Sequence, residues 1–237
     1  MKDKIYLSTY KSIPIKSDKR VHIELINYLK KYKDKIKDKK VECLDIASGK
    51  GAFTQQLLDI TDNFIVDCND LDKNNLANGY RSFFNIDLNT LFDFNKTYDF
   101  IFAIEIIEHL ENPFQFIRQM KKHLKPGGII FLSTPNVNSF FDRIHYFFTG
   151  YPYYFGSRGI INSEGHIMMC PTWLLEHIAE NEKLKFRVIS KNITTKGLNH
   201  LIGIKSNIIL KILSPIKFLV KDYNNQSGII CTFEKNV

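Results

Sequence analysis

Clustered cysteines, long apolar runs and internal repeats are all lacking in this sequence of 237 residues. The four cysteines, Cys43, Cys68, Cys170 and Cys231, lie far apart, so neither a disulfide framework nor a cysteine metal site is indicated. No stretch of about 18 uncharged apolar residues occurs, which argues against a membrane-spanning helix. The basic residues 1–10 lack the apolar core of a secretory signal. We therefore expect a protein of the reducing cytoplasm.

Composition is compatible with one folded domain. Hydrophobic residues make up 44% of the chain, enough for one substantial core, so we expect 1–237 to form a single domain with elaborations. The net charge of +8 is diffuse, and much of it lies in Lys30–Lys40. A solvated helix face explains that run better than a nucleic-acid patch does, so no nucleic-acid partner is favoured.

The apolar pattern predicts alternating strands and helices. A leading helix is expected in an N-terminal helical region, 1–40, and further helices are expected after residue 51, after the Asn112–Pro113 cap signal and at 172–180. The fold class is therefore α/β, a seven-stranded, mostly parallel Rossmann-like sheet with helices on both faces. The expected strands are 41–46, 63–69, 83–86, 98–104, 129–133, 184–190 and 228–234, the fifth entered through a turn at 126–128.

A glycine-rich turn joins the first strand to the next helix. The segment Val41–Phe53 reads VECLDIASGKGAF, with Asp45 followed at every second place by Ala47, Gly49 and Gly51. Glycine lets a ligand lie against the main chain, and the helix directs free N–H groups toward it. A dinucleotide site would need glycines at the first, third and sixth places. This spacing instead favours a nucleoside-like cofactor whose positive amino group suits an acidic strand end.

Acidic residues also end the next two expected strands. Asp70 ends the second strand, where a carboxylate can accept hydrogen bonds from both ribose hydroxyls of a cofactor, and Asp72 is a competing candidate. Asp87 and Leu88 follow the third strand. The carboxyl ends of parallel strands share one edge of the sheet, so these side chains are expected near the glycine-rich turn.

Three motifs together resemble the class I S-adenosylmethionine-dependent methyltransferases. Val41–Phe53 resembles motif I of that family, with Ala47 where the family usually has its first glycine. Tyr98–Pro113, YDFIFAIEIIEHLENP, closely resembles the motif that ends strand four, and Leu124–Asn136, LKPGGIIFLSTPN, resembles the strand-five signature. The resemblance covers the chain from Val41 to about Ser190, and it implies methyl transfer from S-adenosylmethionine.

The resemblance also implies which residues contact the cofactor. Asp70 would hold the ribose, Asp87 the exocyclic amine of the adenine and Leu88 its face. The full set of expected cofactor contacts is Asp45, Ala47, Gly49, Gly51, Phe53, Asp70, Leu71, Asp87, Leu88, Ile104 and Glu105.

Two histidines are the candidates for the catalytic base that an oxygen acceptor needs. They are His109, after the strand-four motif, and His166, and a histidine takes up a proton near neutral pH. An alternative treats Glu105, Glu108 and both histidines as ligands of a divalent cation, as in the small-RNA 3′-end methyltransferases that this stretch resembles. This chain lacks the second histidine of the later motif in those enzymes, so we expect no metal.

The acceptor is expected to meet an aromatic insertion, 137–165, whose segment 140–159 is either a lid that stacks on rings or an ordinary aromatic core. The surrounding sequence most resembles bacterial methyltransferases of surface-glycan assembly (capsule and O-antigen). That resemblance implies O-methylation of a sugar or nucleotide-linked precursor, including a phosphorus-linked one. The alternatives are an RNA 3′-end or small-metabolite methyltransferase, and a non-catalytic subunit that binds the cofactor.

A second insertion, 195–222, precedes the last expected strand. Lysines interrupt its apolar segment 201–221, and Pro215 breaks any single helix there. A cap on the acceptor site or a dimer contact is favoured over a segment that lies on anionic lipid. The sequence leaves the acceptor and the oligomeric state open.

Overall fold

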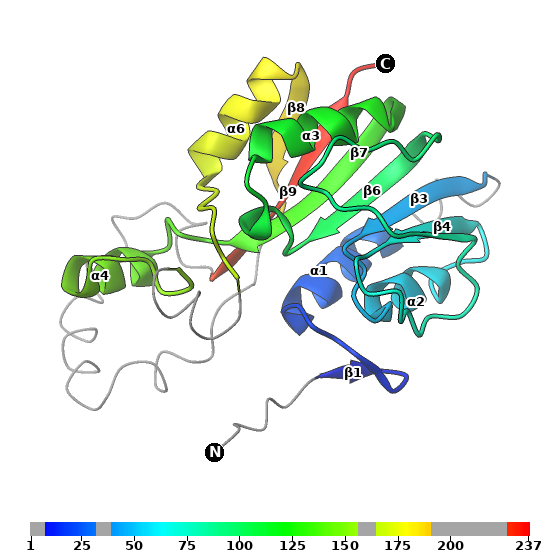
Figure 1. Ribbon diagram of the computed structural model, residues 1–237, viewed down its shortest axis with the longest axis horizontal. Coiled ribbons are helices and arrows are strands. Elements are labelled where there is room, and N and C mark those ends of the chain that lie inside the picture. The colour runs from blue at the N-terminus through cyan, green and yellow to red at the C-terminus, as the bar shows by residue number, and fades with distance from the viewer. Residues whose placement is uncertain (1–7, 32–38, 156–164, 191–226) are drawn as a thin grey trace.

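The computed structural model describes residues 8–31, 39–155, 165–190 and 227–237 (Figure 1). Most of the lysine-rich run 30–40 and all of the insertion 195–222 lie outside these ranges. The expectations for a solvated helix face, and for a cap, dimer contact or lipid contact at 201–221, therefore fall on residues that are not described.

A single seven-stranded sheet forms the centre of the molecule, in the order β5-β4-β3-β6-β7-β9-β8. Every neighbouring pair from β5 to β7 is parallel, whereas β9 runs antiparallel to both β7 and β8. This arrangement confirms the predicted fold class. The strands are β3 (Val41–Ile46), β4 (Phe64–Asn69), β5 (Ser82–Phe84), β6 (Tyr98–Ile104), β7 (Leu124–Pro135), β8 (Leu184–Val188) and β9 (Gly228–Lys235).

Helices cover both faces of this sheet (Figure 1). The helices α1 (Lys19–Lys30) and α2 (Ala52–Leu58) pack on one face, and α3 (Pro113–Lys122) and α6 (Thr172–Asn181) pack on the other. Side chains of a strand alternate between the two faces, so Cys43 of β3 joins the core under α1, whereas Leu44 joins the core under α3. All four cysteines are buried free thiols.

The N-terminal region differs from the helical region predicted for 1–40. Its described part begins with a two-stranded hairpin of β1 (Thr9–Tyr10) and β2 (Ile13–Pro14), and only then enters α1. Lys11 and Ser12 form the turn with φ of 46° and 66°, the left-handed conformation of tight hairpin turns, although neither is glycine. Ile13 and Ile15 then pack against Ala52, which places the segment beside the glycine-rich turn.

Strand boundaries also shift at two places. The third strand, β5, comprises Ser82–Phe84 rather than 83–86. The turn expected at 126–128 instead lies inside β7. At this point the residue pairing between β6 and β7 is irregular, since Tyr98 pairs with Leu124 and the next pair is Phe100 with Ile129. Gly127 takes a φ of 73°, and a Cβ on Gly128 would lie 2.9 Å from the Lys125 carbonyl oxygen, so the two glycines allow this irregularity.

The described part of the aromatic insertion contains α4 (Phe140–Thr149), which Ser139 caps by accepting a hydrogen bond from the Asp142 backbone N–H. Across the described ranges, no helix combines the length and apolar character needed to cross a bilayer.

Candidate functional site

A cavity of about 1060 Å³ opens at the carboxyl ends of the parallel strands. It is lined by residues at or just beyond the ends of β3, β4, β6 and β7, together with the segment that leads into α1. Ligands of open α/β sheets bind at this edge, because the strand-to-helix turns converge there. The predicted site residues that line it are Asp45, Ala47, Gly49, Phe53, Asp70, Ile104, Glu105, His109 and His166.

The turn after β3 has the backbone that its sequence predicts. Ala47, Gly49 and Gly51 all have left-handed backbone angles, with φ of 53°, 56° and 86°. A Cβ on Gly51 would lie 2.0 Å from Asn75 Oδ1, so glycine is required there by both conformation and space. Ala47 takes the same conformation at a cost of roughly 1 kcal/mol. The turn thus keeps its shape despite the departure from glycine.

Asp45 is a buried carboxyl group that lines the cavity. It is 2% exposed, and the Thr54 hydroxyl donates a hydrogen bond of 2.5 Å to its Oδ2. Burial raises the pKa of Asp45 to about 7, and the hydrogen bond from Thr54 opposes that rise. A bound cation would favour the ionised carboxylate, which fits the predicted contact with a positive amino group.

Asp70, rather than Asp72, has the geometry expected of the ribose ligand. Asp70 lines the cavity, where its Oδ2 accepts the Gly49 N–H at 2.7 Å and its Oδ1 accepts the Asp72 N–H at 2.8 Å. Asp72 instead pairs with Lys50 at 2.7 Å and is not among the lining residues. Asp72, the competing candidate, therefore takes part in a surface ion pair instead.

Four predicted cofactor contacts do not line the cavity: Gly51, Leu71, Asp87 and Leu88. Leu71 follows Asp70 and is 67% exposed, whereas Leu88 is packed in the hydrophobic core. Asp87 is exposed, and its carboxylate accepts the Asn89 N–H at 2.9 Å. Their roles toward the cofactor stay predictions, including those of Asp87 and Leu88 toward an adenine ring.

Glu105 connects the end of β6 to the start of α1. It has a φ of 48°, and its Oε2 accepts the backbone N–H of Asp18 at 2.8 Å. This hydrogen bond joins positions far apart in the sequence and brings the segment before α1 to the cavity. Sequence reasoning assigned Glu105 to the cofactor or, as an alternative, to a divalent cation, and it missed this contact.

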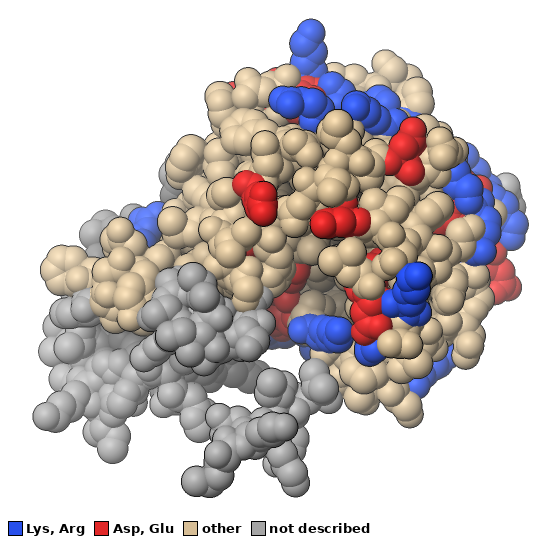
Figure 2. Space-filling view, viewed as in Figure 1, with Lys and Arg blue, Asp and Glu red and all other residues tan. Residues whose placement is uncertain are grey.

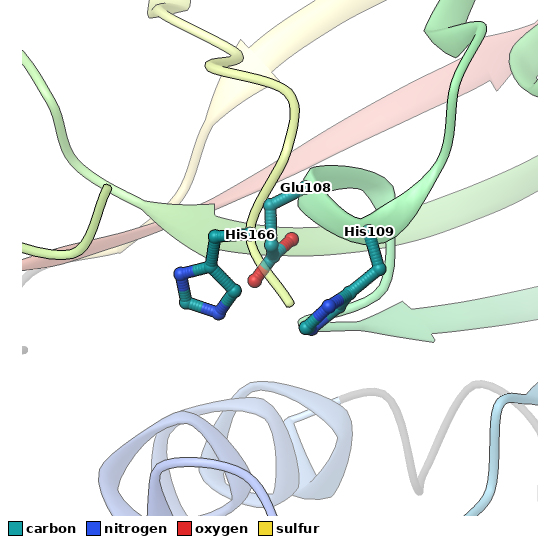
Figure 3. Close-up of side chains that lie close together, drawn as sticks. All are labelled: Glu108, His109 and His166. Carbon is teal, nitrogen blue, oxygen red and sulfur yellow. The ribbon is translucent and has the colours of Figure 1, made fainter. Parts of the chain in front are cut away.

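His109 and His166 lie together at the cavity, as Figure 3 shows. Their ring centroids are 4.8 Å apart. Each Nδ1 faces a carbonyl oxygen, that of Gly165 at 3.2 Å from His109 and that of Tyr154 at 3.0 Å from His166. A carbonyl can only accept, so each Nδ1 carries the proton and each Nε2 is left as an acceptor. Burial lowers the pKa of His166 below its usual 6.5, which favours the neutral ring, the form that can accept a proton.

Glu108 lies beside this pair. It is fully buried, and neither carboxylate oxygen has a hydrogen-bond partner among the described residues. Burial, reinforced by the charge of Glu105, raises its pKa well above 4.5. Ligand atoms of Glu108, His109 and His166 all lie within 4.8 Å of one another. The trio could hold a divalent cation, and Glu105 is not part of it.

Sequence reasoning also missed the residues before and within α1 that line the cavity. These include Lys16, Asp18, Arg20 and His22. His22 is 4% exposed, and burial lowers its pKa to about 4. The Asp18 N-cap was a readable signal for the start of α1, but its position at the cavity depends on the tertiary contact with Glu105.

A family model and curated relatives match this chain. Residues 18–187 match the family model described as a methyltransferase domain. The Ubiquinone biosynthesis O-methyltransferase of Rickettsia conorii is 34% identical over 105 residues, which are 41% of this chain and 36% of that protein. The protein of the same name from Rickettsia canadensis is 34% identical over 105 residues, 41% of this chain and 44% of that protein. The chain thus spans less than half the length of these curated relatives.

Solved structures show the same fold at low sequence identity. A SAM dependent methyltransferase from Archaeoglobus fulgidus aligns with a TM-score of 0.58 and 17% identity, over 90% of this chain and 94% of that one. The plantazolicin methyltransferase BpumL, solved with a triazolic desmethylPZN analog and SAH, aligns with a TM-score of 0.60 and 15% identity. The alignment covers 93% of this chain and 86% of that one. Because the family model matches most of the chain, this chain belongs to the methyltransferase-domain family.

Proposed function

We propose that this enzyme methylates a hydroxyl oxygen of a small molecule, with His166 as the base. The observation that carries the proposal is the orientation of His166, whose Nδ1 donates to the Tyr154 carbonyl and whose Nε2 is thereby an acceptor at the cavity. A hydroxyl is a poor nucleophile until a base takes its proton, and a neutral imidazole can do so. His109, in edge contact with His166, is the second candidate for this role.

The residues of the cavity fit S-adenosylmethionine. Asp45, Asp70 and Glu105 supply carboxyl groups on the sheet side, and the cofactor carries a sulfonium and an ammonium group against one carboxylate. The backbone of the Gly49 turn is shaped for close approach of a ligand. The bound cofactor supplies an activated methyl group, so the protein must hold an acceptor in line with that carbon and remove one proton.

The proton and electron balance is simple. The bound cofactor would supply the methyl group to the acceptor oxygen and would keep the electron pair of the broken carbon–sulfur bond on sulfur. His166 Nε2 would receive the hydroxyl proton and later release it to solvent. No oxidant, reductant or further reactant is needed.

The finer proposal is that the acceptor is a sugar or a nucleotide-linked precursor of a cell-surface polysaccharide, including a phosphorus-linked one. Tyr154 supports it, since this aromatic side chain of the insertion lines the cavity and can stack on a sugar or base ring. Two alternatives have their own support. The printed names of the curated relatives favour O-methylation of a small metabolite, and the Glu108–His109–His166 trio favours a metal-assisted RNA 3′-end enzyme.

A direct assay separates these candidates. The enzyme is incubated with methyl-labelled S-adenosylmethionine and, in parallel, nucleotide sugars, dihydroxyphenols or short single-stranded RNA, and products are identified by mass spectrometry. We expect labelled O-methyl sugar, unaffected by a chelator, with His166→Ala slower by about two to four orders of magnitude. Transfer to a terminal ribose, or activity abolished by chelation and restored by Mg²⁺ or Mn²⁺, would replace the sugar and base assignments. A fully active His166→Ala enzyme would refute both roles for this residue.

A further inference from the structure

Acidic and basic side chains both line the cavity. The strand ends contribute Asp45, Asp70 and Glu105, and the segment that enters α1 contributes Lys16, Lys19 and Arg20 together with the acidic Asp18. Figure 2 shows acidic and basic side chains close together at the hollow on this face of the molecule. We call the three strand-end carboxyl groups the acidic wall and the three basic side chains of the α1 segment the basic wall.

Two basic groups at the cavity already have an acidic partner. Arg20 forms an ion pair with the Asp18 carboxylate, and Lys50, at the glycine-rich turn, is 2.7 Å from Asp72. Lys16 and Lys19 are exposed, and neither pairs with an acidic group in the part of the chain that the structure describes. Two positive charges of the basic wall are therefore uncompensated by the described protein.

The cofactor alone does not account for both lysines. S-adenosylmethionine carries two positive groups and one carboxylate, so its net charge of about +1 matches the acidic wall. Its product of methyl transfer, S-adenosylhomocysteine, is close to neutral. The acceptor is the remaining ligand of the cavity, and an anionic acceptor would be attracted by the two lysines, which bind phosphate and carboxylate as point charges.

We propose that Lys16 and Lys19 bind an anionic group of the methyl acceptor, a phosphate or a carboxylate, and so select charged acceptors over neutral ones. This inference rests on the proposed function and names the acceptor class of the same cavity. The two residues act in binding and specificity and take no part in the proton transfer. Their effect is therefore expected in KM rather than in kcat.

The experiment measures binding to enzyme saturated with S-adenosylhomocysteine, using two matched pairs of probes. UDP is compared with uridine to report phosphate, and benzoate with benzyl alcohol to report carboxylate. We expect the anion of at least one pair to bind about tenfold or more tightly than its neutral partner at low salt, and Lys16→Gln/Lys19→Gln to remove most of that preference. Lys185→Gln is the matched control, since Lys185 lies on the edge strand β8 with Glu234 as its neighbour, and it should keep the preference.

Three results would overturn the inference. Equal binding of the anion and the neutral probe in both pairs would show that the cavity does not select anions. A preference for the anion that survives in the double variant would show that other residues bind it. Weaker S-adenosylhomocysteine binding in the double variant would assign the lysines to the cofactor carboxylate. Wild-type enzyme that fails to bind S-adenosylhomocysteine would instead refute the proposed function, which makes that failure distinguishable from the other three.

Discussion

Replacing Asp70 with alanine tests the cofactor site most sharply. The carboxylate of Asp70 has about four lone-pair positions, and two of them accept the backbone N–H groups of Gly49 and Asp72. The other two are left for the ribose hydroxyls, and each charge-assisted hydrogen bond contributes about 1.5 to 3 kcal/mol. Asp70 is only half-buried, so water offsets part of this energy. We therefore expect Asp70→Ala to lose about 2 to 4 kcal/mol, a roughly 30-fold to 900-fold rise in Kd.

Titration calorimetry with S-adenosylhomocysteine measures this loss, and two further variants control it. Asp70→Asn retains an oxygen for the Gly49 N–H but removes the charge, so its Kd should lie between those of wild type and Asp70→Ala. Asp72→Ala removes the surface partner of Lys50 and should bind like wild type. The ribose contact of Asp70 is refuted if Asp70→Ala is folded and binds S-adenosylhomocysteine with wild-type affinity. A large loss of affinity in Asp72→Ala would assign the ribose contact to Asp72.

Three further predictions concern the base, the glycine turn and the core. For the base, kcat/KM should rise with pH and level off, with its midpoint below 6.5, because burial lowers the pKa of His166 and only the neutral ring accepts a proton; a midpoint well above 6.5 would contradict this. Gly51→Ala should greatly weaken S-adenosylhomocysteine binding, since its Cβ would meet Asn75, whereas Gly150→Ala, with a similar φ of 81° and open space around it, should bind normally; equal affinities would show that the close contact is irrelevant. Asp67→Ala should destabilise the fold by about 1 to 3 kcal/mol in urea titrations, because it leaves the buried Tyr98 hydroxyl without its acceptor and takes one acidic partner from the partly exposed Arg81 and Lys96; no measurable loss would mean that these contacts contribute little.

Local sequence signals were sufficient for much of the sheet. The strand Tyr98–Ile104 was predicted with its observed ends, because its apolar run stops at the charged Glu105. The start of α3 was also readable, since Asn112 accepts a hydrogen bond from the Gln115 N–H and Pro113 occupies the first turn, where no donor is needed. Such signals depend only on neighbours in the chain.

Features that depend on tertiary contacts were missed. Nothing in the residue types at Lys11–Ser12 indicates a left-handed hairpin turn, which commonly uses glycine or asparagine. The burial of Leu88 in the hydrophobic core was likewise not anticipated, and its predicted role at an adenine face stays a prediction. The cavity lining from Lys16 to Arg20 could not be predicted, because the hydrogen bond from the Asp18 N–H to Glu105 joins residues distant in the sequence.

We propose that one cavity binds S-adenosylmethionine and that the enzyme transfers its methyl group to a small-molecule hydroxyl. Mass spectrometry of reactions with methyl-deuterated S-adenosylmethionine and nucleotide sugars, run with wild type and Asp70→Ala, decides this. We expect an enzyme-dependent labelled methyl group on a sugar oxygen, together with S-adenosylhomocysteine, and a much lower yield from Asp70→Ala. Labelled methyl found only on RNA, or no transfer to any hydroxyl by enzyme that binds S-adenosylhomocysteine, would contradict it.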